Sequence, residues 1–243
     1  MSHSFSINWV NSVDSTNAKA KNDYNSGLLK SGYVIVADTQ TGGRGQMRTK
    51  WHDEAGKNLL LTLVIEPQRL LAIDFFRLNQ AISLAICDAL EKDCEPKIKW
   101  PNDILVDERK IAGILIETSI QRDFIKTAFI GVGLNVNQEN FDFDFKATSL
   151  RNEIDKEIDR QLLLDKLLEA IEFRLQQMQI PVVLNSNYLL RLLGINQYYS
   201  YRDKDGEFLA KVVRVESDGR LMLQVKNSHN YRYYRFKEVQ LVG

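Results

Sequence analysis

Two long stretches of the chain repeat apolar residues at helical spacing. The stretch from Asp74 to about Lys92 predicts an amphipathic helix because its apolar side chains fall on one face. These apolar positions are Phe75, Leu78, Ile82, Ala85, Ile86 and Ala89. A second helix is predicted from about Arg160 to Met178, with Asp159 as its N-cap and Pro181 marking its end.

Shorter elements precede and separate these two helices. A short helix is predicted from about Asn17 to Asn25, followed by Gly27 as a stop signal. The polar turn Asp107–Arg109 indicates that the strands on either side of it form a hairpin. Apolar and β-branched runs predict strands at Tyr33–Ala37, Leu59–Ile65, Lys97–Trp100, Ile104–Val106, Lys110–Glu117 and Phe129–Asn135.

The pattern changes from Gln197 to the C-terminus. Five short strand-like runs follow one another there, and the first three are separated by turns that carry Asp205-Gly206 and Asp218-Gly219. Evenly spaced short strands predict a small β-barrel. We therefore expect an α+β fold with one large domain over residues 1–194 and a small barrel domain over residues 195–243.

The composition is that of an ordinary soluble globular protein. The chain has 243 residues, of which 44% are hydrophobic and 26% charged, and its formal net charge is zero. Any anion binding must therefore come from local placement of charge. No signal peptide or membrane span is visible, and the two cysteines suggest reduced thiols, so we expect a cytoplasmic protein. The three histidines form no cluster with ligand spacing, so no metal site is predicted.

The most informative segment is Gly42–Trp51, which reads GGRGQMRTKW. Its glycines allow successive N–H groups to form an anion nest, and Arg44 offers a planar fork that matches a phosphate or a carboxylate. The segment matches neither of the common glycine-rich nucleotide motifs. From the residues alone, a solvated surface turn remains the alternative interpretation.

Three further segments combine polar groups with tight turns. Asp14–Asn17 (DSTN) is either a plain helix cap or a set of groups that bind a polar ligand. Lys99–Asp103 (KWPND), followed by Lys110, is either a proline turn with a charged hairpin or a site with a compact cation and a carboxylate. Gly131–Asn137 (GVGLNVN) is either a bulge with tight sheet packing or a place where a ligand approaches the backbone.

In this order and spacing, the four segments resemble the catalytic domain of biotin protein ligases. The matching strings are DSTN, DTQTGGRG followed by Trp51, KWPNDIL, RKIAGILIE and GVGLNVN, with ATSL at Ala147–Leu150 behind them. The resemblance implies a mixed β-sheet flanked by helices and a C-terminal barrel similar to Src-homology-3 domains. It also implies an enzyme that makes biotinyl-adenylate from biotin and ATP with Mg²⁺, then passes biotin to one lysine of a biotin carboxyl carrier protein domain.

The resemblance also implies a role for each site residue. Lys110, Arg44 and Asp103 are the expected catalytic residues. The two cations would stabilise charge at the α-phosphate, and Asp103 would orient or deprotonate the incoming lysine. The expected biotin-binding residues are Ser15, Thr16, Asn17, Gln40, Gly43, Arg44, Gly45, Gln46, Lys110, Gly113, Gly131 and Gly133. The expected nucleotide-binding residues are Arg44, Gln46, Arg48, Trp51, Asn102, Lys110 and Asn135.

One position of the glycine loop departs from the family pattern. Many members carry an arginine directly after GRG, where this chain has Gln46. We expect Gln46 to act only as a hydrogen-bonding contact, with Arg48 as the candidate to supply the missing charge. We also expect ligand to order residues Thr41–Lys50 over the site, which would exclude the water that hydrolyses a mixed anhydride.

Two other functions fit parts of the pattern. A lipoate ligase or octanoyl transferase of the same superfamily would share the fold and the lysine, although KWPND and the glycine loop favour biotin. A catalytically idle module that senses biotin or adenylate fits the loss of basic residues at Gln46 and Thr49, whereas Lys110 and Arg44 argue against it.

Because the chain begins close before Asp14, we expect the short form without an N-terminal DNA-binding domain. We expect no nucleic-acid or membrane partner, and a monomer or a homodimer.

Overall fold

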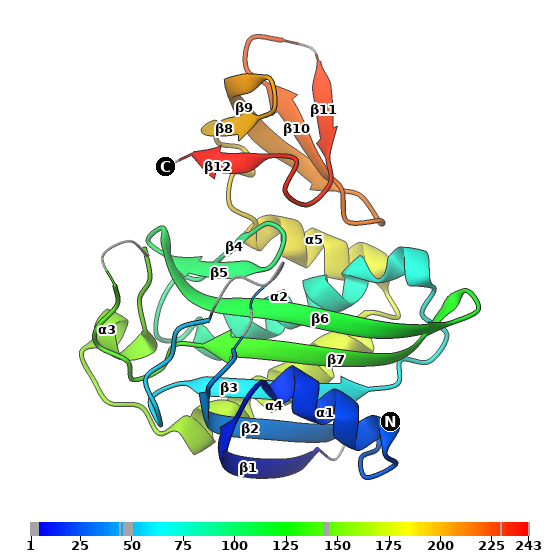
Figure 1. The fold of residues 1–243 in the computed structure, drawn as a ribbon. Helices are drawn as coiled ribbons and strands as arrows, with labels where there is room; N and C mark the ends of the chain where they lie inside the picture. Colours follow the sequence, from blue (N-terminus) through cyan, green and yellow to red (C-terminus); the bar gives the residue numbers. More distant parts are fainter. Residues whose placement is uncertain (1–4, 44, 46–50, 143–145, 229, 243) are drawn as a thin grey trace.

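A computed structural model describes residues 5–43, 45, 51–142, 146–228 and 230–242 of the chain. A sheet of seven strands has helices on both faces, and a separate sheet of five strands lies at the C-terminal end (Figure 1). This arrangement confirms the predicted α+β class with a mixed, helix-flanked sheet. Among the described residues, no helix is both long and apolar enough to cross a membrane.

The large sheet has the strand order β1-β2-β3-β7-β6-β5-β4. Strand β1 runs parallel to β2, and the other neighbouring strands are antiparallel. The predicted hairpin between β5 and β6 is confirmed, and its turn residues Asp107 and Glu108 have φ values of 47° and 63°. The strands are β1 (Ser6–Val13), β2 (Tyr33–Gln40), β3 (Leu59–Ile65), β4 (Lys97–Lys99), β5 (Asp103–Val106), β6 (Arg109–Gln121) and β7 (Phe124–Leu134).

Alternating residues of the central strands face opposite sides of the large sheet. Val34 and Val36 pack in the main core with the helices α2 (Phe76–Leu90), α4 (Arg160–Gln177) and α5 (Pro181–Arg191). Ile35, between them, belongs to a smaller cluster with Ala20 of α1 (Thr16–Asn25). Figure 1 accordingly shows α1 in front of the sheet and α2 and α4 behind it.

Helix α4 begins where the sequence predicts, since the Asp159 side chain accepts hydrogen bonds from the N–H groups of Gln161 and Leu162. Helix α5, however, was not predicted. Pro181 ends no element there: it occupies the first turn of α5, where proline is tolerated because that position needs no N–H donor.

Two other elements also escaped the sequence pattern. Strand β1 lies at the edge of the sheet and is largely half-buried or exposed, so its sequence SINWVNSV lacks an apolar run. Helix α3 (Leu150–Ile154) has only five residues, too few to show a helical period. A 3₁₀ turn, Ala72–Asp74, precedes α2, so that helix starts slightly later than its apolar pattern suggests.

The five predicted C-terminal strands are confirmed. They pair antiparallel in the order β11-β10-β9-β8-β12. Within the described residues no pairing joins β11 to β12, so the sheet is not shown to close into a barrel, and the domain division at residues 194 and 195 stays a prediction. The strands are β8 (Tyr199–Asp203), β9 (Gly206–Val215), β10 (Leu221–Val225), β11 (Tyr231–Tyr234) and β12 (Gln240–Val242).

Candidate functional site

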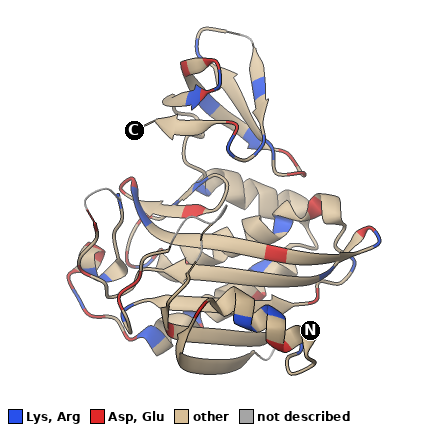
Figure 2. Cartoon of the chain, viewed as in Figure 1, with Lys and Arg blue, Asp and Glu red and all other residues tan. Residues whose placement is uncertain are grey.

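A cavity of about 690 Å³ is lined by residues of both sheets. Strands β6 and β7 contribute Gly113 and Gly131, the start of α1 contributes Thr16, and the C-terminal sheet contributes Tyr201 and Leu241. This volume lies in the range of sites that enclose a small molecule. Figure 2 shows basic and acidic positions interspersed over the chain.

Most of the predicted site residues meet at this cavity. Those that line it are Ser15, Thr16, Asn17, Gln40, Gly45, Trp51, Asn102, Asp103, Lys110, Gly113, Gly131, Gly133 and Asn135. Gly43 is buried behind them, and its carbonyl accepts a hydrogen bond of 3.0 Å from the N–H of Trp51. Arg44, Gln46 and Arg48 lie outside the described residues, so their contacts and the closure of the loop stay predictions.

One end of the cavity is built by a buried polar network at the start of α1. Gln40 accepts two hydrogen bonds from Thr16, at 2.8 Å from its N–H and 3.1 Å from its hydroxyl. The amide of Asn17 donates to Leu115 and, at 3.0 Å, to the carboxylate of Glu117. Because main chain and side chains from α1, β2 and β6 are fixed against one another, this end presents an organised polar surface to the cavity.

Thr62 completes this network and was missed by the sequence analysis. Its hydroxyl lies 2.6 Å from Oδ1 of Asn17 and 2.8 Å from the hydroxyl of Thr16. A lone threonine inside the apolar run Leu59–Ile65 is the signal that could have found it. The capping interpretation of DSTN is not supported, because Ser15 occupies the N-cap position of α1 without a side-chain capping bond.

Lys110 and Asp103, two of the expected catalytic residues, form an ion pair. The Lys110 ammonium lies 2.6 Å from a carboxylate oxygen of Asp103, and its Nζ lies 5.5 Å from the ring centroid of Trp51. Both charged side chains are about one-third exposed, so water and ligand can reach them. A compact cation between a carboxylate and an aromatic face can meet an anion delivered through the cavity.

The glycines of GVGLNVN mark two close approaches on β7. A Cβ atom built on Gly131 would lie 2.5 Å from Oδ1 of Asn17, and one built on Gly133 would lie 2.6 Å from the Trp51 ring. Both glycines are therefore required by the packing of site residues against the strand. Gly113 on β6 has a similar but looser contact, at 3.1 Å from the Lys110 side chain.

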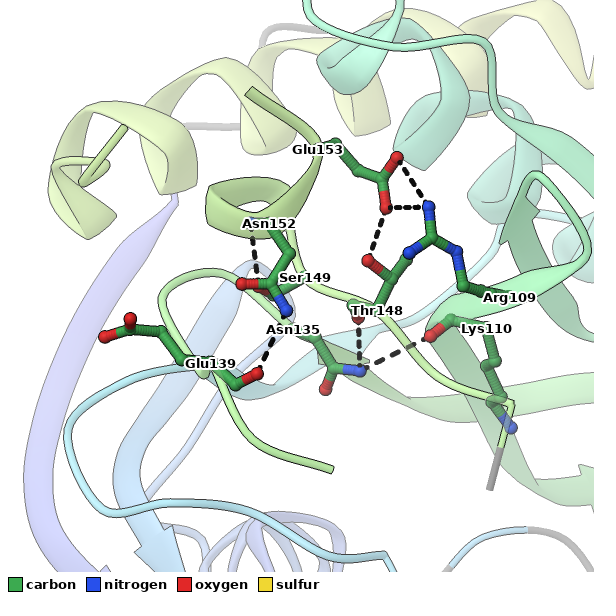
Figure 3. Close-up of polar contacts among 8 residues, drawn as sticks. All are labelled: Arg109, Lys110, Asn135, Glu139, Thr148, Ser149, Asn152 and Glu153. Carbon is green, nitrogen blue, oxygen red and sulfur yellow. Dashed lines mark hydrogen bonds and ion pairs between the residues drawn. The ribbon is translucent and has the colours of Figure 1, made fainter. Parts of the chain in front are cut away.

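Two asparagines lie at the other end of the cavity. The amide of Asn102 donates to the carbonyl of Ile114 at 2.7 Å. The amide nitrogen of Asn135 donates to the carbonyl of Thr148 at 2.9 Å and lies 3.5 Å from that of Lys110 (Figure 3). Within the described part of the chain, Oδ1 of Asn135 and the indole N–H of Trp51 are buried without a hydrogen-bond partner. Asn135 thus has an unpaired acceptor beside the cavity.

The C-terminal sheet supplies lining residues that the sequence analysis did not assign. Phe236, Lys237 and Leu241 reach the cavity. Phe236 also packs edge-to-face against Trp100 of the KWPND segment, with ring centroids 6.3 Å apart. No local motif signals these residues, because their role depends on how the two sheets pack.

The thiols offer no nucleophile. Cys87 and Cys94 are free, as predicted. Burial raises the pKa of Cys87 to about 12 and that of Cys94 to about 11, so both stay protonated at neutral pH. Among the described residues, His, Cys, Asp and Glu side chains do not gather in groups that could hold a metal ion.

Comparison with known proteins agrees with this site. Residues 9–135 match the family described as "Biotin/lipoate A/B protein ligase family". This chain belongs to the biotin/lipoate A/B protein ligase family. The matched range contains DSTN, the glycine loop, KWPND and the strand up to Asn135, so the resemblance seen in these segments is confirmed.

Known relatives and a solved structure are similar to this chain over most of its length. The "Bifunctional ligase/repressor BirA" of Bacillus spizizenii is 30% identical over 225 residues, 88% of this chain and 68% of the relative. The "Biotin--[acetyl-CoA-carboxylase] ligase" of Mycobacterium tuberculosis is 30% identical over 89% of this chain and 82% of its own length. The biotin protein ligase of Aquifex aeolicus, solved in complex with biotin and ATP, superposes with a TM-score of 0.79 at 26% identity, covering 97% of this chain and 98% of that protein.

Proposed function

We propose that this protein is an ATP-dependent biotin–protein ligase. It forms biotinyl-5′-AMP from biotin and ATP, then transfers the biotinyl group to a lysine of a biotin carboxyl carrier protein domain. One observation carries the proposal: the polar network at the start of α1, the Lys110–Asp103 pair and Asn135 line a single cavity. The two substrates must meet in one enclosed space for the reaction to occur. The names of the relatives and the ligands of the Aquifex aeolicus structure support the same conclusion.

The first half-reaction joins two anions. A carboxylate oxygen of biotin attacks the α-phosphorus of ATP, a P–O bond forms, and pyrophosphate leaves with the electrons of the broken bond. Negative charge gathers on the phosphoryl oxygens, and the compact ammonium of Lys110 stabilises it. Arg44 is proposed as the second cation, with Gln46 and Arg48 as further contacts, on the strength of the family motif.

The second half-reaction moves the acyl group to the carrier. The neutral amine of the carrier lysine attacks the carbonyl carbon of biotinyl-AMP, an amide bond forms, and AMP leaves. Asp103 is proposed to accept or orient the proton of that amine, because its carboxylate lines the cavity and lies 2.6 Å from the Lys110 ammonium. Asp103→Asn is therefore expected to slow transfer from preformed biotinyl-AMP at least tenfold. An unchanged single-turnover rate would remove Asp103 from this step.

The two ends of the cavity suit the two substrates. Thr16, Asn17 and Gln40 offer hydroxyl and amide groups for the ureido ring of biotin, with Ser15 and Gly45 beside them. The free Oδ1 of Asn135 suits a donor such as the adenine amino group, with Trp51 as an aromatic wall. Mg²⁺ enters as part of the Mg–ATP substrate, since this ion is held largely by substrate phosphates and water.

Mass spectrometry of a carrier domain incubated with this protein, biotin and Mg–ATP tests the proposal. We expect the mass increase of one biotinyl group and pyrophosphate release that requires both biotin and ATP. Labelling with lipoate instead of biotin would identify a lipoate ligase. Biotin binding without pyrophosphate release would identify a sensing module. Either result would overturn the proposed reaction.

The proposal also includes the cellular location and the oligomeric state of the protein. ATP and carrier domains are cytoplasmic substrates and both cysteines are free, so we place the protein in the cytoplasm. The proposed assembly is a monomer or a homodimer.

A further inference from the structure

The ATSL segment, Ala147–Leu150, reaches the cavity with Ala147 and pairs with the start of β6. The N–H of Lys110 donates to the carbonyl of Lys146 at 2.8 Å, and the N–H of Thr148 donates to the carbonyl of Lys110 at 2.9 Å. Lys110 and Ala147 thus form a short parallel bridge. The main chain of Lys110 is therefore held on both sides of its Cα by this segment.

The same segment holds Asn135. The N–H of Leu150 donates to the carbonyl of Asn135 at 3.1 Å, and the amide nitrogen of Asn135 donates to the carbonyl of Thr148 at 2.9 Å. This contact uses the donor side of the Asn135 amide and leaves Oδ1 buried without a partner among the described residues. Two residues that line the cavity thus depend on the main chain of one residue, Thr148, whose N–H donates to Lys110 and whose carbonyl accepts from Asn135.

A side-chain network fixes Thr148 in turn (Figure 3). The fully buried hydroxyl of Thr148 donates to the carboxylate of Glu153 in α3. The Glu153 side chain is 8% exposed and lies 3.1 Å from the guanidinium of Arg109, the residue before Lys110. The contacts form a closed circuit from Arg109 through Glu153 and Thr148 to Lys110.

We propose that Thr148 and Glu153 are positioning residues for the nucleotide half of the site. They touch no substrate, but they set the backbone of Lys110 and the orientation of the Asn135 amide before ATP arrives. The proposal rests on the proposed function. The proposed role of Thr148 and Glu153 is to position Lys110 and Asn135, which is distinct from forming α3 or lining the cavity.

The biotin half of the site depends on a different network. Thr16, Asn17 and Gln40 are fixed by Thr62 and Glu117, and none of these five hydrogen-bonds to Thr148 or Glu153. Loss of the Thr148 hydroxyl is therefore expected to weaken the use of ATP and to leave biotin binding intact. A general loss of stability would weaken both.

Thr148→Val tests the proposal, because it removes the hydroxyl at nearly constant volume. We expect the KM for ATP to rise about tenfold, the effect of losing one buried hydrogen bond, with the Kd for biotin alone changed less than twofold. Thr148→Ser restores the hydroxyl and is expected to return the KM close to the wild-type value. Glu153→Met removes the acceptor and is expected to act in the same direction, so it tests the proposal even where Thr148→Val fails to fold.

Thr127→Val is the matched control. Thr127 is also fully buried and donates its hydroxyl, at 3.1 Å to Tyr24, but it does not line the cavity. We expect it to lower Tm without changing the KM for ATP. The positioning role is overturned if Thr148→Val and Glu153→Met match this control, or if they weaken biotin and ATP equally. Wild-type protein that releases no pyrophosphate with biotin and ATP would instead overturn the proposed function.

Discussion

At Lys110 a compact cation, a carboxylate and an indole ring meet within one cavity. The ion pair with Asp103 is short, yet both side chains are about one-third exposed. Pairs of this kind contribute about 0–1 kcal/mol to stability. The pair therefore matters for the placement of charge rather than for the fold.

Lys110→Met should separate these two effects. We expect kcat for biotin-dependent pyrophosphate release to fall at least ~100-fold, because a fixed charge at the developing phosphoryl anion is lost, while Tm changes little. Steady-state kinetics and thermal melts measure the two quantities. Lys126→Met is the control, since Lys126 is exposed on β7 and does not line the cavity. Equal kcat in the two variants would remove Lys110 from the chemistry.

Thr62 is placed next to the residues that are proposed to bind biotin. Its fully buried hydroxyl fixes Asn17 and Thr16. Thr62→Val leaves those partners short of one donor, which costs about 1–3 kcal/mol, so the Kd for biotin is expected to rise roughly tenfold with the KM for ATP unchanged. Calorimetric titration with biotin checks this. Thr127→Val again serves for comparison, and a Kd equal to that of the control would contradict the prediction.

At the scale of elements, strand β7 carries two glycines on one face, and a different site residue packs against each of them. Gly131 lies against Asn17 and Gly133 against the Trp51 ring. A methyl group at either position would overlap its neighbour, and each neighbour belongs to a different end of the cavity. In the proposed reaction, one strand would thereby set the separation between the biotin end and the nucleotide end of the site.

Gly131→Ala and Gly133→Ala should therefore give opposite patterns. We expect Gly131→Ala to weaken biotin binding most, since Asn17 must move, and Gly133→Ala to raise the KM for ATP most, since Trp51 must move. Each variant is the control for the other, because both add one methyl group to the same face of the same strand. Biotin titration and ATP kinetics on both variants measure the pattern. If both variants change the Kd for biotin and the KM for ATP in the same proportion, the two glycines do not act on different substrates and the prediction is contradicted.

The sequence predicted the elements that carry a local signal. Leu59–Ile65 was found because it is a continuous apolar run, and the start of α4 because Asp159 caps it. Strand β1 and helix α5 were missed because an edge strand needs no apolar run and a proline can open a helix as well as end one.

The candidate site divides in the same way. Lys110, Asp103 and the glycines lie in short motifs, whereas Thr62 and Glu153 lie outside these motifs and act through contacts with other segments. Thr62 of β3, for example, bonds to Thr16 at the start of α1, which lies 46 residues earlier in the chain. Such contacts follow from strand order and helix placement, which no local spacing determines.

At the scale of the whole molecule, the C-terminal sheet is fixed to the segment that carries Asp103. The indole N–H of Trp100 donates to the carbonyl of Gly219 at 3.0 Å. Gly219 has φ of +85° and lies so close to Phe76 of α2 that an added Cβ would be 2.9 Å from the ring. The turn at Gly219 is therefore held between Trp100 and Phe76, and Phe236 and Lys237 of the same C-terminal part line the cavity.

Trp100→Phe removes this hydrogen bond and keeps an aromatic ring against Phe236. We expect the KM for ATP to rise about threefold to tenfold, since a net hydrogen bond contributes about 0.5–1.5 kcal/mol, with biotin binding unchanged. Gly219→Ala should act in the same direction although Gly219 does not line the cavity, because its methyl group pushes the turn away from Phe76. Gly27→Ala is the matched control, with φ of +75° and no atom within 4 Å of an added Cβ. If Gly219→Ala and Gly27→Ala have the same KM for ATP, the position of the C-terminal sheet does not affect nucleotide binding, and the prediction is wrong.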